Sequence, residues 1–196
     1  MIYQKSYYIN NPKATIIIVH GISEHSGRYK ELALRFNEEG YDVLTYDHIG
    51  HGKSSGKRGK LKSFHEMIDI LHSIVLKEKS RNNNKIFLLG HSMGGGVVNL
   101  YEAKYSNIDG IISSSAATNT PRELRLFKYI GFYLLRWVKI SSKMFDDHLA
   151  KDPKVLENNK KDPLMLKFMY LSLLGEMFIK GVKYLHKNNF YTALSK

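Results

Sequence analysis

Apolar runs alternate with amphipathic stretches along the first 117 residues of the chain. Residues 14–19 form a β-branched apolar run without polar alternation, which fits a strand buried on both faces, as in a parallel sheet covered by helices. A short edge strand is predicted at residues 4–9, before the turn sequence Asn-Asn-Pro. Three more strands are predicted at residues 41–46, 85–90 and 108–115.

Helical periodicity fills the intervals between these strands. Apolar residues at i, i+3, i+4 and i+7 between residues 29 and 36 predict an amphipathic helix that ends at Gly40. Apolar residues between 64 and 75 predict a second helix, and those between 97 and 101 predict a third. Because strands and helices alternate, we expect a mostly parallel α/β sheet.

The pattern changes after residue 117, and no strand is predicted from there to residue 196. Residues 121–140 are apolar on nearly all sides at helical spacing, with arginines and lysines between the aromatic residues. Such a helix is either buried in the protein or lies against lipid, and both alternatives stay open. Helix starts are predicted at Asp152-Pro153 and Asp162-Pro163. The second leads into a helix over residues 164–179, and a last helix is expected to reach about residue 187.

Residues 85–96 combine an apolar run, the sequence Gly-His-Ser-Met-Gly and two further glycines. This order predicts a buried strand, a tight turn and a helix, with Ser92 at the apex in a strained backbone conformation. Glycines flank the serine because side chains there would collide with the neighbouring strand or helix. The turn would hold the Ser92 hydroxyl above the sheet and the Met93 N–H towards a developing oxyanion. The alternative is a glycine-rich turn with an incidental serine.

The chain of 196 residues suits one domain, and it contains no cysteine. Its formal net charge of +12 suggests nucleic acid as one candidate partner. The basic residues are scattered without a nucleic-acid-binding motif, so we expect no nucleic acid, and attraction to an anionic lipid surface fits better. We find neither signal-peptide features nor an apolar run long enough to span a membrane. We therefore expect a cytoplasmic protein that can associate with membranes, and its oligomeric state stays open.

Three motifs stand in order along the first half. They are His-Gly-Ile-Ser-Glu-His-Ser-Gly-Arg-Tyr at 20–29, Asp-His-Ile-Gly-His-Gly at 47–52 and Gly-His-Ser-Met-Gly-Gly at 90–95. Together they closely resemble the monoacylglycerol lipase and lysophospholipase branch of the α/β-hydrolases, among the serine aminopeptidase-like S33 hydrolases. Asp162-Pro163-Leu164 is similar to the lid region of that branch. The resemblance implies an α/β-hydrolase core over residues 1–117 and a helical lid, with a helix returning toward the core, over residues 118–196.

The resemblance implies Ser92 as the nucleophile that attacks an ester carbonyl to form an acyl-enzyme. The backbone N–H groups of Ile22 and Met93 would form the oxyanion hole, and Glu24 and Arg28 would lie near the polar head of a glycerol-type substrate. No metal or cofactor is implied. The lid helices would line an apolar channel for the acyl chain of a lipid ester substrate, and the lid would contact a membrane peripherally.

Several other histidines and aspartates are expected to be structural. Asp47 and His51 resemble residues that fix loops in this family, and His20 and His91 are also expected to be structural. The second half offers Asp146, Asp147, His148 and His186. A triad built from these four would require the lid to supply both the acid and the base, so we expect residues 146–148 to be an exposed loop or helix end.

The family carries its catalytic acid and histidine after the serine, on loops that follow later strands, and we find no such segment before Lys196. We therefore expect a sequence truncated relative to the family, with the last core strands missing. Without a general base, Ser92 would be a weak nucleophile, and the strand ending near Ser115 would expose an apolar edge. The alternatives are an acyltransferase or peptidase on the same scaffold, a non-catalytic lipid-binding or interaction protein, and an unstable relic.

Overall fold

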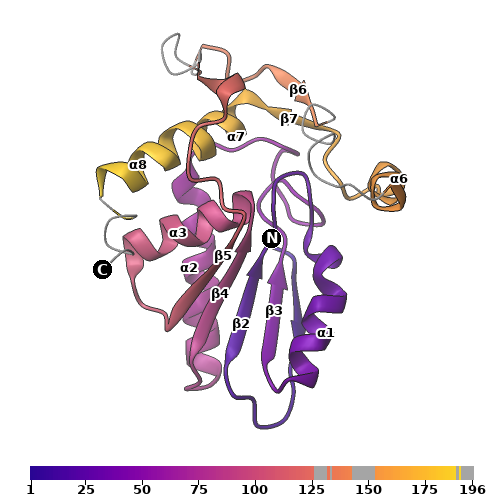
Figure 1. Ribbon diagram of the computed structural model, residues 1–196, viewed down its shortest axis with the longest axis vertical. Helices are drawn as coiled ribbons and strands as arrows, with labels where there is room; N and C mark the ends of the chain where they lie inside the picture. Colours follow the sequence, from indigo (N-terminus) through magenta and orange to yellow (C-terminus); the bar gives the residue numbers. More distant parts are fainter. Residues whose placement is uncertain (126–131, 133, 143–152, 189, 191–196) are drawn as a thin grey trace.

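The structure, a computed structural model, describes residues 1–125, 132, 134–142, 153–188 and 190. Its main sheet has the strand order β1-β3-β2-β4-β5, in which β1 is antiparallel to β3 and the other neighbours are parallel (Figure 1). All of the strands predicted before residue 117 are confirmed, and so is the mostly parallel α/β sheet. The strands are β1 (Gln4–Tyr7), β2 (Thr15–Val19), β3 (Asp42–Tyr46), β4 (Ile86–His91) and β5 (Gly110–Ser114).

Helices cover both faces of this sheet. The helix α1 (Lys30–Glu38) lies on one face, and α2 (Phe64–Arg81) and α3 (Met93–Tyr105) lie on the other (Figure 1). Alternate residues of β2 serve the two layers: Ile17 and Val19 belong to the core cluster that includes α2 and α3, whereas Ile16 and Ile18 pack in the cluster of α1. Every residue of β2 is buried. The uninterrupted apolar run therefore reflects a strand covered on both faces.

Two short strands lie in the second half, where none was predicted. The strand β6 (Lys139–Ser141) pairs antiparallel with β7 (Phe168–Tyr170). Each strand has 3 residues, which is too few for a period of two to be distinguished from helical spacing. The prediction of no strand after residue 117 is wrong, because a pairing between segments far apart in sequence stabilises two strands that carry no strand pattern of their own.

The prediction of one helix over residues 121–140 is wrong for the described residues of that range. A short 3₁₀ helix at Arg122–Leu124 is followed by turns over residues 134–137 and then by β6, while residues 126–131 and 133 lie outside the described residues. Leu124 and Phe132 are buried, whereas Leu134 is 71% exposed and Trp137 is 64% exposed. The apolar residues of this range are therefore divided between the core and the surface, and their spacing does not correspond to the faces of one helix.

The later helix predictions are partly confirmed. The helix α6 (Pro153–Lys161) begins at the predicted Pro153. At Asp162-Pro163 no helix starts, because the Leu164 N–H donates to Asp162 Oδ1 at 2.8 Å in a turn that leads towards β7. Helical structure follows as α7 (Leu171–Gly175), a π-helix (Glu176–Gly181) and α8 (Val182–Lys187). Within the described part of the chain, no helix is both long and apolar enough to cross a membrane.

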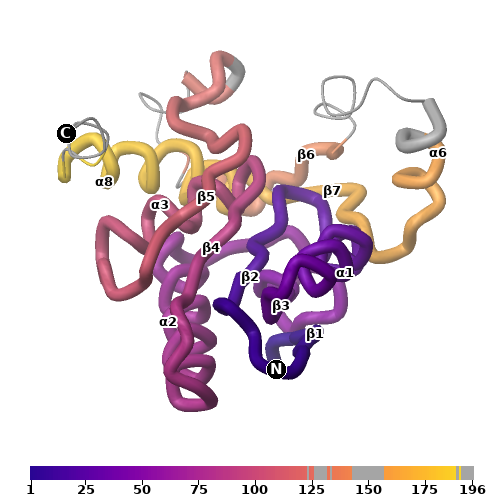
Figure 2. Tube along the Cα trace, turned by 60° about the horizontal axis from the view of Figure 1, so that its bottom comes forward, coloured from indigo at the N-terminus to yellow at the C-terminus, as the bar shows by residue number. Residues whose placement is uncertain are grey.

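The helices at the C-terminal end of the described chain pack on α2 and α3 (Figure 2). Gly181 allows the close approach, since a Cβ there would lie 3.1 Å from Leu100 Cδ1 of α3. The buried Glu176 carboxylate accepts the Phe64 N–H at 3.2 Å through Oε2 and the Lys180 ammonium at 2.6 Å through Oε1. Glu176 thus satisfies a backbone donor in the first turn of α2 and binds the second half to the core.

One edge of the described sheet is open. The strand β5 is the last strand on its side, and its Ile112 side chain is 47% exposed. This edge is the one expected from the sequence near Ser115. The division of the chain into residues 1–117 and 118–196 stays a prediction.

Candidate active site

Ser92 occupies the turn between β4 and α3 in a backbone conformation that residues with a side chain rarely adopt. Its φ is 53° and its ψ is −117°, in agreement with the strain predicted for the apex. The flanking glycines have no room for a side chain: a Cβ on Gly90 would lie 2.3 Å from Gly94 O, and a Cβ on Gly94 would lie 2.0 Å from Val19 O. The turn is therefore possible only because β4, α3 and the end of β2 meet backbone to backbone.

Backbone hydrogen bonds hold this turn in place. The Ser92 N–H donates to Ser114 O at 2.9 Å, and Ser92 O accepts the N–H groups of Gly96 at 3.2 Å and Ala117 at 3.4 Å. The Ser92 side chain is partly exposed, and within the described residues its hydroxyl makes no hydrogen bond to a histidine. The hydroxyl thus stands at the carboxyl edge of the sheet, one residue before the N-terminus of α3 at Met93.

The loop after β2 lies against Ser92. The strands β2 and β4 pair in parallel with Val19 opposite Gly90, so the residues that follow both strands reach the same edge of the sheet. A Cβ on Gly21 would lie 3.4 Å from Ser92 Cβ. Ile22 follows Gly21 directly, and the register therefore brings the segments that carry Ile22 and Met93 to the same serine.

Asp47, the residue that follows the neighbouring strand β3, fixes this loop. Its Oδ1 accepts the Ser26 N–H at 2.7 Å, and its Oδ2 accepts the Lys53 N–H at 2.7 Å. Burial raises the pKa of the Asp47 carboxyl, but the hydrogen bonds from Lys53 and Ser26 outweigh burial and hold the pKa below its usual range. Gly52 admits the carboxylate, since a Cβ there would lie 2.2 Å from Asp47 Oδ2. The loop-fixing role expected of Asp47 agrees with this geometry.

Three buried imidazole rings pack together beside the same loop. The ring centroid of His20 lies 4.3 Å from that of His48 and 5.4 Å from that of His51. The backbone N–H of His48 donates to His20 Nε2 at 3.0 Å. The imidazole of His20 therefore carries its proton on Nδ1, which donates to Gly21 O at 2.8 Å. Burial lowers the pKa of His48 to about 3 and of His51 to about 4, and burial with the two neighbouring imidazoles lowers that of His20. The three rings are neutral near pH 7, and His20 and His48 donate to the backbone carbonyls of Gly21 and His20.

Glu24 and Arg28 lie on the loop that contacts Ser92. A Cβ on Gly21 would lie 2.6 Å from Glu24 Oε1, so the carboxylate is held against the backbone beside the serine. Arg28 Nε lies 3.7 Å from Glu24 Oε2, and Arg28 Nη1 also donates to Asn159 Oδ1 of α6. The structure thus gathers Ser92, Gly21 and Glu24, with Arg28 joined to the cluster through Glu24.

A segment of the second half is bound to this same loop. The His25 Nε2–H donates to Asp162 Oδ2 at 2.8 Å, and the Leu166 N–H donates to Ser23 O at 2.9 Å. Burial raises the pKa of the Asp162 carboxyl, and the hydrogen bonds from His25 and Leu164 bring it below its usual range. Sequence reasoning missed this contact. His25 and Asp162 each stand in a motif, but they are 137 residues apart and no spacing rule connects them.

The other candidates lie elsewhere. Asp146, Asp147 and His148 fall outside the described residues. His186, near the end of α8, lines a cavity of about 390 Å³ with Thr120, Val182 and other residues. In the part of the chain that the structure describes, no group of three or more acidic or histidine side chains is arranged to hold a metal ion.

Comparison with known proteins finds relatives along most of the chain. The family described as serine aminopeptidase, S33, matches residues 10–190. A monoacylglycerol lipase of Mycolicibacterium smegmatis is 32% identical over 162 residues, which cover 79% of this chain and 57% of that protein. A monoglyceride lipase of Homo sapiens is 33% identical over 160 residues, which cover 79% of this chain and 53% of that protein.

The fold gives the same result. The crystal structure of a monoacylglycerol lipase from Paleococcus ferrophilus matches with a TM-score of 0.81 at 29% identity, covering 96% of this chain and 72% of that one. The chain spans 57% and 53% of the lengths of the two curated relatives. The parallel sheet, the serine turn and the match over residues 10–190 together establish that this chain belongs to the serine aminopeptidase S33 family of α/β-hydrolases, in the branch that includes the monoacylglycerol lipases.

Proposed function

We propose that this chain carries the nucleophile and oxyanion hole of a serine ester hydrolase that acts on monoacylglycerol or lysophospholipid-type esters through an acyl-enzyme. The observation that carries the proposal is Ser92 at φ 53°, on a turn whose glycines leave no room for a side chain. Such strain costs roughly 1–3 kcal/mol. A glycine would adopt this conformation without strain. We infer that a serine occupies the position because its hydroxyl is needed for the chemistry.

The proposed reaction begins with attack of Ser92 Oγ on the ester carbonyl carbon. Negative charge then develops on the carbonyl oxygen, and the N–H groups of Met93 and Ile22 donate to it. Met93 supports this role because it is the first residue of α3, and Ile22 because it follows the glycine packed against Ser92. Each donor contributes roughly 3–4 kcal/mol to the transition state. The alcohol leaves, and water hydrolyses the acyl-enzyme.

The proton of Ser92 needs an acceptor, and within the described residues no histidine is hydrogen-bonded to the hydroxyl. The nearby imidazoles of His20 and His48 are buried and already donate to backbone carbonyls. A serine without a base is a weak nucleophile near neutral pH. We therefore expect the chain of 196 residues to react slowly, with only the acceleration that the oxyanion donors and binding supply.

The substrate class rests on the polar groups beside the serine and on the relatives. The ion pair of Glu24 and Arg28 stands on the loop that contacts Ser92, where both side chains are partly exposed. A carboxylate and a guanidinium at that position suit the hydroxyl groups of a glycerol head. The two curated relatives are named for monoacylglycerol or monoglyceride lipase activity, and this supports the same substrate class here.

Exposed apolar side chains in the second half support contact with a lipid surface. Leu134 and Trp137 are exposed beside the basic residues Arg136 and Lys139, and Phe168 of β7 is 57% exposed. Aromatic and basic residues together favour the interface of an anionic membrane. We propose that this surface brings the lid to the lipid that holds the substrate. The cytoplasmic location stays a prediction.

Labelling with a fluorophosphonate tests the nucleophile. We expect slow labelling at Ser92, located by peptide mass spectrometry, and its loss in Ser92→Ala but not in the matched variant Ser114→Ala. Added imidazole, a small base, should raise the rate of ester hydrolysis in the unmodified chain above the rate in Ser92→Ala. Equal adducts at Ser92 and Ser114, with no effect of imidazole beyond that in Ser92→Ala, would contradict the proposal.

A substrate panel separates the proposal from its alternatives. In the presence of imidazole we expect monoacylglycerols and lysophospholipids to be cleaved faster than aminoacyl amides, which a peptidase would prefer. Transfer of the acyl group to glycerol in preference to water would favour an acyltransferase. Vesicle binding that survives Ser92→Ala, with no esterase activity under any condition, would favour the non-catalytic lipid-binding protein.

A further inference from the structure

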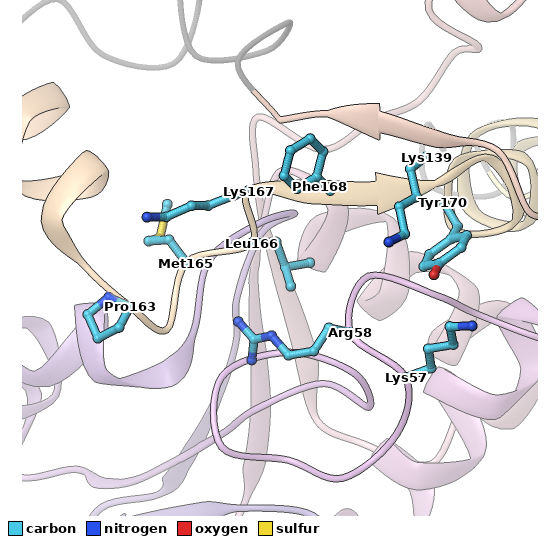
Figure 3. A pocket seen from close by; sticks show the side chains of 9 residues that line it. All are labelled: Lys57, Arg58, Lys139, Pro163, Met165, Leu166, Lys167, Phe168 and Tyr170. Carbon is cyan, nitrogen blue, oxygen red and sulfur yellow. The ribbon is translucent and has the colours of Figure 1, made fainter.

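A cationic cavity lies between the turn over residues 57–60 and the β7 segment, and its lining includes none of the residues assigned to the serine site (Figure 3). Its volume is about 600 Å³, within the usual range for a small-molecule site. Four of its lining residues are basic, and none of the described lining residues is acidic. The lining residues are Lys57, Arg58, Lys139, Pro163, Met165, Leu166, Lys167, Phe168 and Tyr170.

Three ammonium groups surround one aromatic ring at this cavity. The Nζ atoms of Lys57, Lys60 and Lys139 lie 5.2, 5.5 and 5.6 Å from the ring centroid of Tyr170, which is 8% exposed. Figure 3 shows Lys57 and Lys139 reaching the end of the cavity that holds this ring. The ring attracts each ammonium, but the ammonium groups repel one another. Among the described residues none of the three lysines has a carboxylate partner, and Glu66 lines the adjacent cavity with Lys57, Lys60 and Lys62.

The groups around the cavity are held in place by backbone contacts. Arg58 donates through Nη1 to Gly52 O at 2.6 Å and through Nη2 to Leu164 O at 2.8 Å, so its guanidinium is fixed without neutralisation of its charge. The Tyr170 N–H donates to Gly59 O at 2.8 Å. Gly59 has a φ of +67°, and a Cβ there would lie 2.6 Å from Phe168 O. The turn that carries Lys57 and Lys60 is thus locked to the strand that carries the ring, which is the preorganisation of a binding site.

The chemistry of the lining selects the ligand. An aliphatic chain would remove water from four charges without compensation, so this cavity is unsuited to the acyl chain of an ester. A phosphate group offers several anionic oxygens to ammonium and guanidinium donors. Leu166, Met165 and Phe168 supply an apolar part beside the charges, which suits an organic group attached to the phosphate.

We propose that this cavity binds the phosphate group of a phosphate ester. Lys57 and Lys139 are the principal donors, and Arg58 and Lys167 supply the other positive charges of the lining. The phosphate is carried either by a lipid headgroup or by a soluble compound. The site does not depend on the hydrolytic role of Ser92. Lys139 and Phe168 also belong to the surface proposed to contact lipid, so binding of soluble phosphate esters tests the cavity separately from that surface.

Binding is measured on the whole chain in two arms, and Ser92→Ala serves to exclude catalysis. One arm titrates inorganic phosphate and glycerol phosphate by calorimetry at constant ionic strength. The other measures sedimentation with vesicles of phosphatidylcholine alone or with added phosphatidic acid. The double variant Lys57→Gln/Lys139→Gln removes two charges from the cavity. The double variant Lys30→Gln/Lys77→Gln removes two exposed charges elsewhere and is the matched control.

We expect the cavity variant to bind at least tenfold more weakly and the control variant to bind within twofold of the unmodified chain. Lys57→Arg/Lys139→Arg should retain binding, because it keeps the charges. Binding in the soluble arm identifies a soluble phosphate ester, and binding to phosphatidic acid vesicles alone identifies a lipid headgroup. Absence of binding in both arms, or an equal loss in the cavity and control variants, would overturn the proposal. Unchanged urea unfolding midpoints establish that the variants fold.

Discussion

The His25 imidazole donates through Nε2 to Asp162 Oδ2 at 2.8 Å, joining the loop beside Ser92 to the second half of the chain. The second ring nitrogen, Nδ1, accepts the Gly27 N–H at 3.2 Å. Both ring nitrogens are thus used, Nε2 as a donor and Nδ1 as an acceptor. Asp162 accepts the Leu164 N–H with its other oxygen. One carboxylate therefore organises its own turn and holds that turn against the loop of Ile22 and Glu24.

Asp162→Ala should destabilise the protein by about 1–3 kcal/mol, because it removes two hydrogen bonds to a carboxylate at a partly buried position. The free energy of unfolding in urea measures this change, and proteolysis of the segment around residue 162 should become faster. The exposed carboxylate of Asp69, which pairs with Lys104 and is 53% exposed, provides the control. Asp69→Ala should cost less than about 1 kcal/mol. Equal losses in the two variants would contradict a specific role for the His25–Asp162 contact.

Gly90→Ala and Gly94→Ala should each prevent stable folding or cost more than about 3 kcal/mol. The added Cβ would meet backbone oxygen atoms at 2.3 and 2.0 Å, and backbone at this junction cannot move without separating β2, β4 and α3. Gly96→Ala is the control, in the same helix α3 as Gly94, since the nearest neighbour of its Cβ would be Ala117 O at 3.9 Å. It should stabilise the protein by about 0.5–1 kcal/mol through helix propensity. Thermal and urea unfolding of the three variants check the contrast.

Ser92→Gly should raise the free energy of unfolding by about 1 kcal/mol relative to Ser92→Ala. A glycine adopts the positive φ of residue 92 without strain. The strain energy removed from the folded state is larger than the free energy lost because glycine has more conformational entropy in the unfolded chain. Both variants lack the hydroxyl, so the comparison isolates the backbone. A Ser92→Gly variant no more stable than Ser92→Ala would mean that the turn is relaxed, and the argument for a nucleophile would lose its support.

The stability of the protein should fall as the pH drops below about 6.5, the usual pKa of histidine. The pKa values of His48 and His51 are lowered to about 3 and about 4, so between these values and 6.5 the unfolded chain binds protons that the folded chain does not. The contribution of these two histidines to the free energy of unfolding is therefore fully present above pH 6.5. As the pH falls from 6.5 towards the folded-state pKa values, each histidine lowers this free energy by roughly 1.4 kcal/mol per pH unit.

His51→Asn tests the contribution of one ring. The asparagine amide can replace His51 Nδ1–H as the donor to Ile49 O, a hydrogen bond of 3.1 Å, and it does not titrate. The slope of unfolding free energy against pH, measured in urea between pH 7 and pH 5, should decrease by the share of one histidine. An unchanged slope would mean that His51 is protonated in the folded protein.

The core was predictable because its signals are local. A strand that is covered on both faces needs consecutive apolar residues, as in β2, and a strained serine turn needs glycines at fixed offsets, as at Gly90 and Gly94. Both patterns can be recognised within a short stretch of sequence, although the contacts that require them, such as Gly94 against Val19 O, are between different elements. The second half was harder, because β6 and β7 have 3 residues each and exist only through each other. The apolar spacing over residues 121–140 predicts one helix, yet Leu124 is buried whereas Leu134 and Trp137 are exposed.

By itself, the sequence determined the α/β class, the strands before residue 117, the serine turn and the family, since each depends on residue type at short, regular spacing. Only the tertiary structure decided which distant residues meet. It brought Asp162 to His25 and placed Lys57, Lys60 and Lys139 around Tyr170. These contacts depend on the register of the sheet and on the path of the chain across it. Side chains that lie far apart in sequence leave no periodic signal, so their meeting is decided by packing alone.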